Sequence, residues 1–301
     1  MVNKLPITEQ QNPASSRLDE MSVNSILCLM NEEDRRVPEA ISQVLPQIGA
    51  AVELLVETWR KGGRWIYVGA GTSGRVAALD AMECPPTFGV APERVRALVA
   101  GGEEATVQAF EGTEDDRSAA IRDLGTLGLT RDDAVIGLAA SGHTPYVVAA
   151  IRHALEAGCA TVGVSNNPGS ELGKIACVSI QIITGPEVLT GSTRLKAGTS
   201  QKMVLNMLST AAFTRLGKVY KNFMVDVQAA NEKLKKRASR IVCETAGVSE
   251  DEAGELLRVA RGSVKVAVVM GKAGVSADEA RTLLGAAHGS VREALGAAGT
   301  N

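Results

Sequence analysis

The sequence is poor in aromatic residues, which make up only 3% of its 301 residues. Proteins that bind single-stranded nucleic acid need aromatic side chains on which bases can stack, so this composition argues against that class. The formal net charge is −2, and no block of basic residues stands out along the chain. We therefore expect no nucleic-acid partner.

Long hydrophobic runs are also missing, since no segment approaches the roughly 20 apolar residues of a membrane-spanning helix. The first residues, MVNKLPITEQ, are polar and contain no hydrophobic signal region. The five cysteines are scattered without a Cys-x-x-Cys pair, which is typical of reduced thiols rather than of disulfides or a zinc site. These features predict a cytoplasmic protein with no membrane contact, no metal and no cofactor.

Short apolar runs are the feature that the chain has in abundance. They alternate with helical patterns, and each is followed by a turn rich in glycine or proline; they cover residues 64–68, 95–99, 134–139, 160–165 and 178–183. Continuous apolar strands alternating with helices predict an α/β fold, in which helices cover both faces of a parallel sheet. Ligands of such sheets bind at the carboxyl ends of the strands, so the loops there are the expected site.

The first of these loops is glycine-rich. Residues 64–68 are expected to form a strand, residues 69–74 (GAGTSG) a tight turn, and Arg75 to Met82 the start of a helix. A helix N-terminus offers unpaired N–H groups and the positive end of the helix dipole, and glycines let a ligand approach the backbone. The predicted anion ligands are Gly71, Thr72, Ser73 and Gly74.

The Gly-x-Gly-x-x-Gly pattern also occurs in dinucleotide-binding folds. That interpretation requires an acidic residue at the end of the second strand, but here the strand ends in Ala100-Gly101-Gly102 before Glu103. The hydroxyls of Thr72 and Ser73 suit a phosphate monoester better. A sugar-phosphate loop is therefore favoured, while a nucleotide site and a purely structural turn remain open alternatives.

Later loops repeat the pattern of small hydroxyl residues. They are SGHTP at 141–145, which opens a helix at Pro145, SNNP at 165–168, and TGSTRLK at 190–196, which precedes a long helix. Each hydroxyl alone is more often an N-cap than a ligand, but their combination predicts a phosphate cradle. Its further members are Ser141, His143, Thr144, Ser192, Thr193 and Lys196. His143 is equally well explained as a solvated loop residue.

Two glutamates are candidates for acid–base chemistry. Glu83 stands in front of Pro85-Pro86, which should end the helix after the glycine turn and leave a carboxylate near the phosphate. Glu114 lies in the sequence EGTEDDR at 111–117. There a capping box of Thr113 and Asp116 is the simpler explanation, so composition alone favours a structural role for Glu114.

The two ends of the chain are helical by pattern. Residues 1–25 form a polar arm on the surface or on a partner subunit, and residues 33–61 have apolar side chains at helical spacing, with a break near Pro38 or Pro46. Near the C-terminus, AGVS at 246–249 and GSV at 262–264 recur 27 residues later, which indicates two related helical units. The predicted parts are 1–56 (arm and helices), 57–220 (sugar-phosphate domain) and 221–301 (helical repeat module).

Several segments together resemble the N-acetylmuramic acid 6-phosphate etherases, relatives of the glucokinase regulatory protein that share its sugar isomerase (SIS) domain. They are the turn at 69–74 with Arg75, ECPPTF at 83–88, SGHTPYV at 141–147, GPE at 185–187, TGSTRLK at 190–196 and Gly198-Thr199, together with TEQ at 8–10 and Asn12-Pro13. The resemblance implies a flavodoxin-like SIS domain, a UBA-like C-terminal module and a homodimer with sites near the interface. Met82 and His143 depart from it, where serine and arginine are common.

The resemblance implies a lyase that releases D-lactate from N-acetylmuramic acid 6-phosphate in peptidoglycan recycling. Glu83 falls on the family's acid and Glu114 on its proposed base. Two rival functions remain. A sugar-phosphate isomerase would need a base but no acid for a leaving ether, and a sugar-phosphate sensor would bind without turnover. The presence of both glutamates argues against the sensor, as does a chain about half as long as two SIS domains require.

Overall fold

The computed structural model describes residues 5–108, 110, 112–227 and 232–300. They form two compact units. The first contains the chain up to Met82 together with Glu93–Ser209, and the second contains Glu83–Pro92 together with the residues from Thr210 onward. The described N-terminal residues fall within the first unit, and the predicted division of the chain into three parts stays a prediction.

The first unit is built on five parallel strands: β1 (Trp65–Gly69), β2 (Val95–Val99), β3 (Ala134–Leu138), β4 (Ala160–Ser165) and β5 (Val178–Gln181). Their order, β2-β1-β3-β4-β5, confirms the predicted parallel α/β sheet of flavodoxin-like type. Because β1 lies between β2 and β3, the strand order reverses there. This switch point is where open α/β sheets bind ligands.

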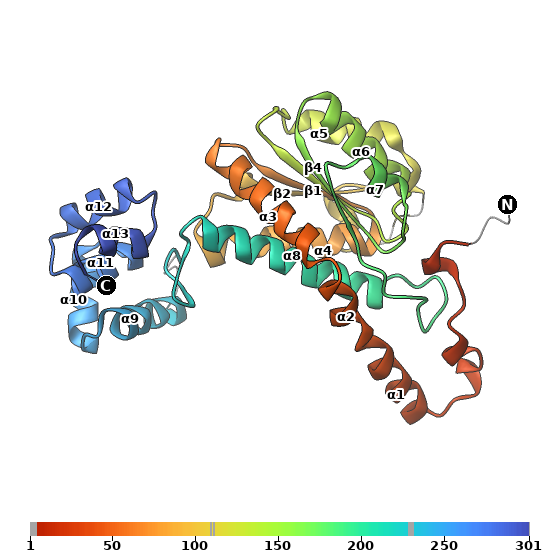
Figure 1. Cartoon of the computed structure of the whole chain (residues 1–301), viewed down its shortest axis with the longest axis horizontal. Helices are drawn as coiled ribbons and strands as arrows, with labels where there is room; N and C mark the ends of the chain where they lie inside the picture. The colour runs from red at the N-terminus through yellow and green to blue at the C-terminus, as the bar shows by residue number, and fades with distance from the viewer. Residues whose placement is uncertain (1–4, 109, 111, 228–231, 301) are drawn as a thin grey trace. The chain divides into compact units, whose positions relative to one another are not determined.

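Helices cover both faces of this sheet (Figure 1). One face carries α3 (Leu45–Arg60), the first turns of α4 (Gly71–Phe88) and α8 (Lys196–Arg215), and the other carries α5 (Arg117–Thr126), α6 (Pro145–Glu156) and α7 (Glu171–Ile175). Alternate side chains of each strand serve the two faces. On β1, Ile66 and Val68 pack with the helix α6 side of the core, while the indole of Trp65 donates to the carbonyl of Leu55 in α3 at 3.0 Å.

Short helical segments precede the sheet. The predicted polar arm contains 3₁₀ turns at Ile7–Glu9, Pro13–Ser15 and Leu18–Glu20, and it leads into α1 (Val23–Asp34) and α2 (Arg36–Ser42). The expected break falls between α2 and α3, and Pro46 lies in the first turn of α3, where its missing N–H costs nothing. In the described part of the chain, no single helix is long and apolar enough to cross a membrane; Val23–Ser42 and Leu45–Arg60 pass that test only as a pair bent by 61°.

The expectation that Pro85-Pro86 would end the helix was wrong, because α4 continues through both prolines to Phe88. The two prolines cannot donate backbone hydrogen bonds to the preceding turn. Packing of the last turn compensates for this loss: Phe88 is buried and stacks on Phe213 at 4.5 Å between ring centroids, and the N–H of Gly89 donates to Pro85. Tertiary contacts therefore override the local preference, and they place Glu83 on a helix rather than at its end.

The second unit is mostly helical. It contains a small hairpin of β6 (Val219–Tyr220) and β7 (Phe223–Met224), followed by α9 (Glu232–Ala246), α10 (Glu250–Val259), α11 (Val264–Ala273), α12 (Ala277–Ala286) and α13 (Val291–Ala297). The 27-residue repeat is visible in the backbone, because Ser249–Glu252 and Ser276–Glu279 both form complete capping boxes. Arg261 and His288, also 27 residues apart, share a left-handed conformation.

A buried carboxylate joins β1, α4 and α8. Asp80 on α4 accepts hydrogen bonds from the hydroxyls of Tyr67 at 2.9 Å and Ser209 at 3.0 Å. Burial raises the pKa of Asp80 to about 6, although these hydrogen bonds and nearby Lys202 oppose the rise. The raised pKa means that the folded state binds this proton more tightly than the unfolded state. The contribution of Asp80 to the free energy of unfolding is therefore greatest below about pH 4, and it is lost as the pH rises through about 6.

Replacing Asp80 with asparagine should stabilise the protein at pH 8 by roughly 2–3 kcal/mol, since the cost of burying the charge disappears. At pH 4 the two proteins should have nearly the same free energy of unfolding, because both side chains are neutral and both hydroxyl partners can rotate to suit the amide. Urea unfolding at the two pH values measures this difference, with the exposed Asp19→Asn variant as control. An equal effect at both pH values would contradict the assignment.

Candidate functional site

The glycine turn is tighter than the sequence suggested, because α4 begins at Gly71 rather than at Arg75. A Cβ atom on Gly69 would lie 2.6 Å from the backbone nitrogen of Gly74, so only glycine allows the strand and the helix to approach so closely. Gly71 has a left-handed backbone (φ +51°). Thr72 and Ser73 therefore belong to the first helical turn, and their N–H groups are among those that a helix leaves unpaired.

A second helix N-terminus meets this turn. Gly198, in the first turn of α8, packs so closely on Thr72 that a Cβ atom there would lie 3.0 Å from the Thr72 methyl carbon. The same atom would lie 3.4 Å from the carbonyl of Thr193, which accepts a hydrogen bond from the N–H of Gly198 at 2.9 Å. Two of the predicted loops are thus brought together, with the positive ends of two helix dipoles at the same edge of the sheet.

The loop after β3 contributes Ser141, His143 and Thr144. The Ser141 hydroxyl accepts the N–H of His143 at 3.1 Å, and the His143 ring lies 2.8 Å from the Ser141 carbonyl. Thr144 is the N-cap of α6, but its hydroxyl makes no capping hydrogen bond. The exposed His143, by contrast, is hydrogen-bonded within its own loop. The roles of Thr144 and His143 as ligands stay predictions.

Lys196 is placed differently from the sequence-based expectation. Its side chain is only 1% exposed, and the ammonium donates to the carboxylate of Glu33 at 2.5 Å and to the carbonyl of Pro186 at 2.7 Å. A cation engaged in this way is occupied by protein groups. The sequence could not reveal this, because the partner carboxylate lies 163 positions away in the chain.

Glu114 lies in the 3₁₀ turn Thr113–Asp115 and is exposed. The predicted capping box was wrong: Asp116, not Thr113, caps α5, and its carboxylate accepts the N–H of Ala119 at 2.9 Å. The Thr113 hydroxyl instead lies within hydrogen-bond distance of two carbonyls, that of Phe110 at 3.2 Å and that of Ala100, after β2, at 3.4 Å. Glu114 is therefore presented by a loop tied to the end of a strand, and its carboxylate is not committed to the helix cap.

Arg75 supports the segment that leads to this loop. From the first turns of α4 its guanidinium donates to the carbonyls of Ala105 at 3.2 Å and Gln108 at 2.9 Å. The connection between β2 and α5 is thereby fastened to the helix that begins at the glycine turn.

Glu83 lies twelve residues beyond Gly71 on α4, which is more than three helical turns. Glu83 thus lies inside the helix rather than at its end, and its role as the acid stays a prediction. Glu83 is exposed, and it shares the outer face of the helix with Leu79 and Met82, which are 44% and 65% exposed. Glu83 belongs to the second compact unit and Glu114 to the first.

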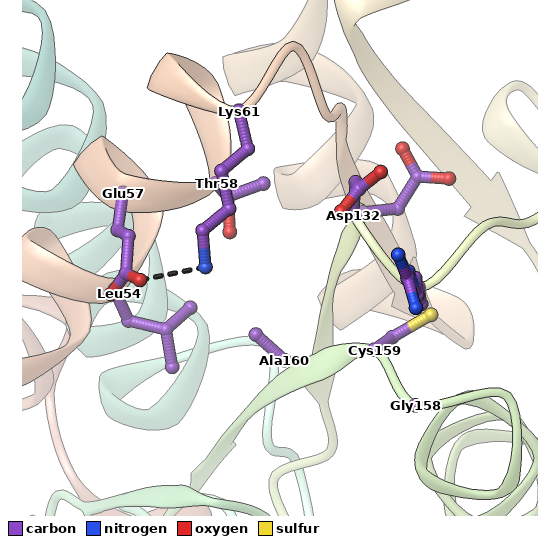
Figure 2. Close-up of a pocket in the computed structure, with 10 residues that line it drawn as sticks. Leu54, Glu57, Thr58, Lys61, Asp132, Gly158, Cys159 and Ala160 are labelled. Carbon is purple, nitrogen blue, oxygen red and sulfur yellow. Dashed lines mark ion pairs between the residues drawn. The ribbon is translucent and has the colours of Figure 1, made fainter.

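A separate cavity of about 250 Å³ opens at the opposite edge of the sheet, at the amino ends of β3 and β4 (Figure 2). Its walls include the exposed ion pair of Lys61 with Glu57 at 2.7 Å, as well as Asp132 and Cys159. Burial raises the pKa of the Cys159 thiol to about 11, so it is unsuited to nucleophilic chemistry. Sheets of this type bind substrates at the other edge, which makes this cavity the weaker candidate.

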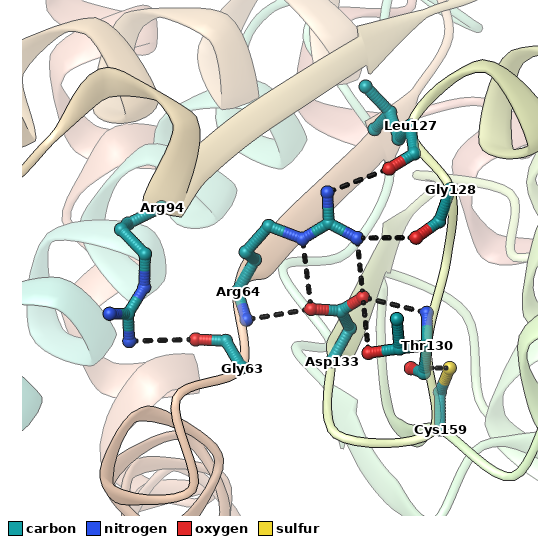
Figure 3. A network of polar contacts seen from close by, with 8 residues as sticks. All are labelled: Gly63, Arg64, Arg94, Leu127, Gly128, Thr130, Asp133 and Cys159. Atoms are coloured by element: carbon teal, nitrogen blue, oxygen red, sulfur yellow. Dashed lines mark hydrogen bonds and ion pairs between the residues drawn. The ribbon is translucent and has the colours of Figure 1, made fainter.

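The polar network beside that cavity is structural (Figure 3). Asp133 is buried, and its carboxylate accepts hydrogen bonds from the guanidinium of Arg64 at 2.7 Å and from the N–H of Thr130 at 2.9 Å. Burial alone would raise the pKa of Asp133, but these hydrogen bonds hold it below its ordinary value. Arg64 also donates to the carbonyls of Leu127 and Gly128, so the network joins the start of β1 to the loop before β3.

A cluster of basic side chains on one helix was not predicted from the sequence. On α9, cations at positions i, i+3, i+4 and i+7 line a hollow of about 300 Å³ in the second unit; they are Lys233, Lys236, Arg237 and Arg240. Helical spacing is the signal that could have revealed them, because net charge hides a one-sided distribution. Within the described residues, no group of three or more His, Cys, Asp or Glu side chains is arranged to hold a metal ion.

Two family models match the chain. The N-terminal SIS domain of the glucokinase regulatory protein matches residues 47–155, and the SIS domain matches residues 118–211. Among solved structures, one named as a phosphosugar isomerase involved in capsule formation, from Bacteroides fragilis NCTC 9343, has a TM-score of 0.52 at 24% identity. It covers 71% of this chain and 96% of that one, and the likeness concerns the fold alone.

Curated relatives are much more similar. An N-acetylmuramic acid 6-phosphate etherase of Geobacillus thermodenitrificans (strain NG80-2) is 56% identical over 263 residues, which are 87% of this chain and 89% of the relative. One of the same name from Mycolicibacterium smegmatis (strain ATCC 700084 / mc(2)155) is 54% identical, over 87% of this chain and 88% of the relative. The similarity thus covers nearly the whole length of both proteins.

Proposed function

This chain belongs to the N-acetylmuramic acid 6-phosphate etherase family, and we propose how its loops and glutamates perform the reaction. It is a carbon–oxygen lyase that cleaves the D-lactyl ether of N-acetylmuramic acid 6-phosphate, giving N-acetylglucosamine 6-phosphate and D-lactate, a step of amino-sugar recycling from peptidoglycan. The observation that carries this conclusion is identity above 50% over nearly the whole chain.

The phosphate is bound where α4 and α8 meet at the switch point of the sheet. The N–H groups of the glycine turn and the dipoles of both helices favour an anion there. Small hydroxyls from three loops surround that edge and supply further hydrogen bonds. The proposed phosphate and sugar ligands are Gly71, Thr72, Ser73, Gly74, Ser141, His143, Thr144, Ser192 and Thr193.

The two glutamates carry out the chemistry. Opening of the sugar ring leaves an aldehyde at C1, which acidifies the proton at C2. Glu114 removes that proton, and Glu83 protonates the C3 oxygen as lactate leaves, so a conjugated double bond forms between C2 and C3. Water then adds at C3 and a proton returns to C2. Each proton transfer by a well-placed side chain gives about 10²–10⁴-fold acceleration.

A second copy of the chain completes the site in this proposal. The apolar side chains of Leu79 and Met82 flank Glu83 on an exposed helix face, and Val23 and Leu27 on α1 are 74% and 60% exposed. Exposed apolar faces of this kind favour burial against another protein surface. A symmetric homodimer would cover them.

A cytoplasmic location is part of the same proposal. Every cysteine is a free thiol, and Cys28 and Cys177 are exposed. Exposed thiols remain reduced in a cytosolic environment.

Incubation of the purified protein with N-acetylmuramic acid 6-phosphate should release D-lactate and N-acetylglucosamine 6-phosphate in equal amounts, with a turnover number on the order of 1–10³ s⁻¹. An enzymatic lactate assay measures the first product and phosphosugar chromatography the second. Fructose 6-phosphate serves as the control substrate, and it should remain unchanged. Interconversion of fructose 6-phosphate without lactate release would instead identify an isomerase, and tight binding without turnover would identify a sensor.

A further inference from the structure

The N-terminal arm is tied to the loops of the phosphate site by buried polar contacts. Thr8 and Asn167 are each 2% exposed and are joined by two hydrogen bonds. The Thr8 N–H donates to the side-chain oxygen of Asn167 at 3.3 Å, and the Asn167 amide nitrogen donates to the Thr8 hydroxyl at 2.9 Å. The same Asn167 amide group lies 3.2 Å from the carbonyls of both Ala140 and Ser141. One amide thus connects the arm to the loop after β3.

A second tie is made by a buried ion pair. The carboxylate of Glu33, at the end of α1, accepts the Asn12 amide at 2.8 Å and the Lys196 ammonium at 2.5 Å. Both donors also reach the carbonyl of Pro186, at 3.3 Å and 2.7 Å. The three side chains are at most 5% exposed, and burial of a charge is tolerated only when it is paired in this way.

The electrostatics agree with this geometry. Burial alone would raise the pKa of Glu33, but the hydrogen bond and charge of Lys196, helped by Arg36 and Asn12, hold it below its ordinary value. The carboxylate is therefore ionised at neutral pH, and Lys196 is its direct counter-ion.

Lys196 is also the first residue of α8, so the ion pair is connected to the site through the backbone. The Glu187 carboxylate accepts the N–H groups of Lys196 at 3.1 Å and Ala197 at 2.9 Å. One residue further on, Gly198 packs on Thr72 of the glycine turn. A displacement of Lys196 would therefore move the turn of α8 against which Thr72 is held.

We propose that Lys196 is a positioning residue rather than a phosphate ligand. With Glu33 and Asn12 it clamps the arm onto the start of α8, and this clamp sets the separation of the two helix N-termini that bind the sugar phosphate. The inference rests on the proposed function for the identity of the ligand, N-acetylglucosamine 6-phosphate, but its test is a binding measurement that needs no turnover.

The Glu33→Gln variant separates the two roles by the sign of its effect. If Lys196 positions α8, the variant should bind N-acetylglucosamine 6-phosphate about 10-fold more weakly, and the KM for N-acetylmuramic acid 6-phosphate should rise more than kcat falls. If Lys196 were a ligand, loss of the competing carboxylate would free its ammonium, and binding would be unchanged or tighter. Titration calorimetry measures the affinity, and thermal unfolding followed by circular dichroism verifies that the variant is folded.

A charge-neutral pair keeps the test decisive if Lys196→Met alone fails to fold. The double variant Glu33→Gln/Lys196→Met leaves neither charge of the pair buried without its partner. If Lys196 has a positioning role, the double variant should bind N-acetylglucosamine 6-phosphate more tightly than Lys196→Met does. If Lys196→Met is unfolded, the double variant should still fold and bind this ligand. The proposal would be overturned if Lys196→Met and the double variant lost affinity for the sugar phosphate equally, or if a folded double variant did not bind it at all. Glu171→Gln, which breaks the exposed pair with Arg152, is the matched control and should change the affinity less than twofold.

The outcomes also separate this inference from the proposed function. Wild-type protein that binds N-acetylglucosamine 6-phosphate but releases no lactate would contradict the etherase reaction, while the Glu33 comparison could still support or overturn the clamp. Wild-type protein that does not bind this sugar phosphate at all would overturn both.

Discussion

Replacing Glu83 with alanine should lower D-lactate release by about 10²–10⁴-fold, while the C2 proton of the substrate continues to exchange with deuterium in heavy water. The reason is that the acid acts only when the C3–O bond breaks. Removal of the C2 proton is a separate step that needs the base and the aldehyde. The exchange therefore reports on Glu114, and lactate release reports on both glutamates.

The comparison with Glu114→Ala makes the assignment of roles testable. That variant should lose deuterium exchange as well as lactate release, because no base remains to start the reaction. Exchange is followed by mass spectrometry of recovered substrate and lactate by an enzymatic assay. Glu93→Ala, which removes an exposed carboxylate outside the proposed machinery, is the control and should leave both signals unchanged. Full lactate release by Glu83→Ala would exclude Glu83 as the acid.

The sequence predicted secondary structure best where the local pattern of residues and the tertiary structure agree. The strands Val95–Val99 and Ala160–Ser165 were located to the residue, because each is a short apolar run bounded by turn residues. Their order in the sheet was not predictable from the residues alone, since pairing depends on contacts between distant segments. The resemblance to SIS domains implied the flavodoxin-like type of the sheet, and the structure gives the order β2-β1-β3-β4-β5.

Errors arose where distant packing overrides a local rule. Pro85 and Pro86 predicted the end of a helix, but α4 continues through both prolines to Phe88, whose ring stacks on Phe213. Lys196 is a different case, because its role as a phosphate ligand stays a prediction. What the sequence could not show is that its ammonium pairs with Glu33, which lies far away in the chain. No spacing rule connects residues so distant in sequence, so only the folded chain reveals such partners.

The glycine turn shows the opposite case. The prediction of an anion site at this turn follows from residue types alone, but the sequence does not show the contact that places a second helix N-terminus beside it. Gly198 of α8 lies against Thr72, so two helix N-termini, each with the positive end of its dipole, lie together at the switch point. The sequence predicted both loops as ligand loops, and the fold brings them side by side.

Hybrid dimers should show whether one site uses glutamates from two chains. Glu83 lies more than three turns along α4 from the glycine turn, on a face that the proposed second copy covers. We therefore expect that Glu83 of one chain completes the site to which the other chain contributes Glu114. Mixing Glu83→Ala with Glu114→Ala subunits, each inactive alone, should then restore about a quarter of wild-type lactate release, because half of the dimers are hybrid and each hybrid has one intact site.

The reciprocal mixture gives the opposite pattern and so serves as the control. Hybrids of wild-type chains with Glu83→Ala/Glu114→Ala chains contain two sites that each lack one glutamate if the sites are shared. If both glutamates came from the same chain, these hybrids would retain one intact site, and the mixture of single variants would stay inactive. Dissociation and reassociation of differently tagged chains, followed by purification of the doubly tagged dimer, isolates each hybrid for the lactate assay. Activity in the reciprocal hybrid alone would place Glu83 and Glu114 in one subunit, and a chain that remains monomeric while active would exclude the shared site altogether.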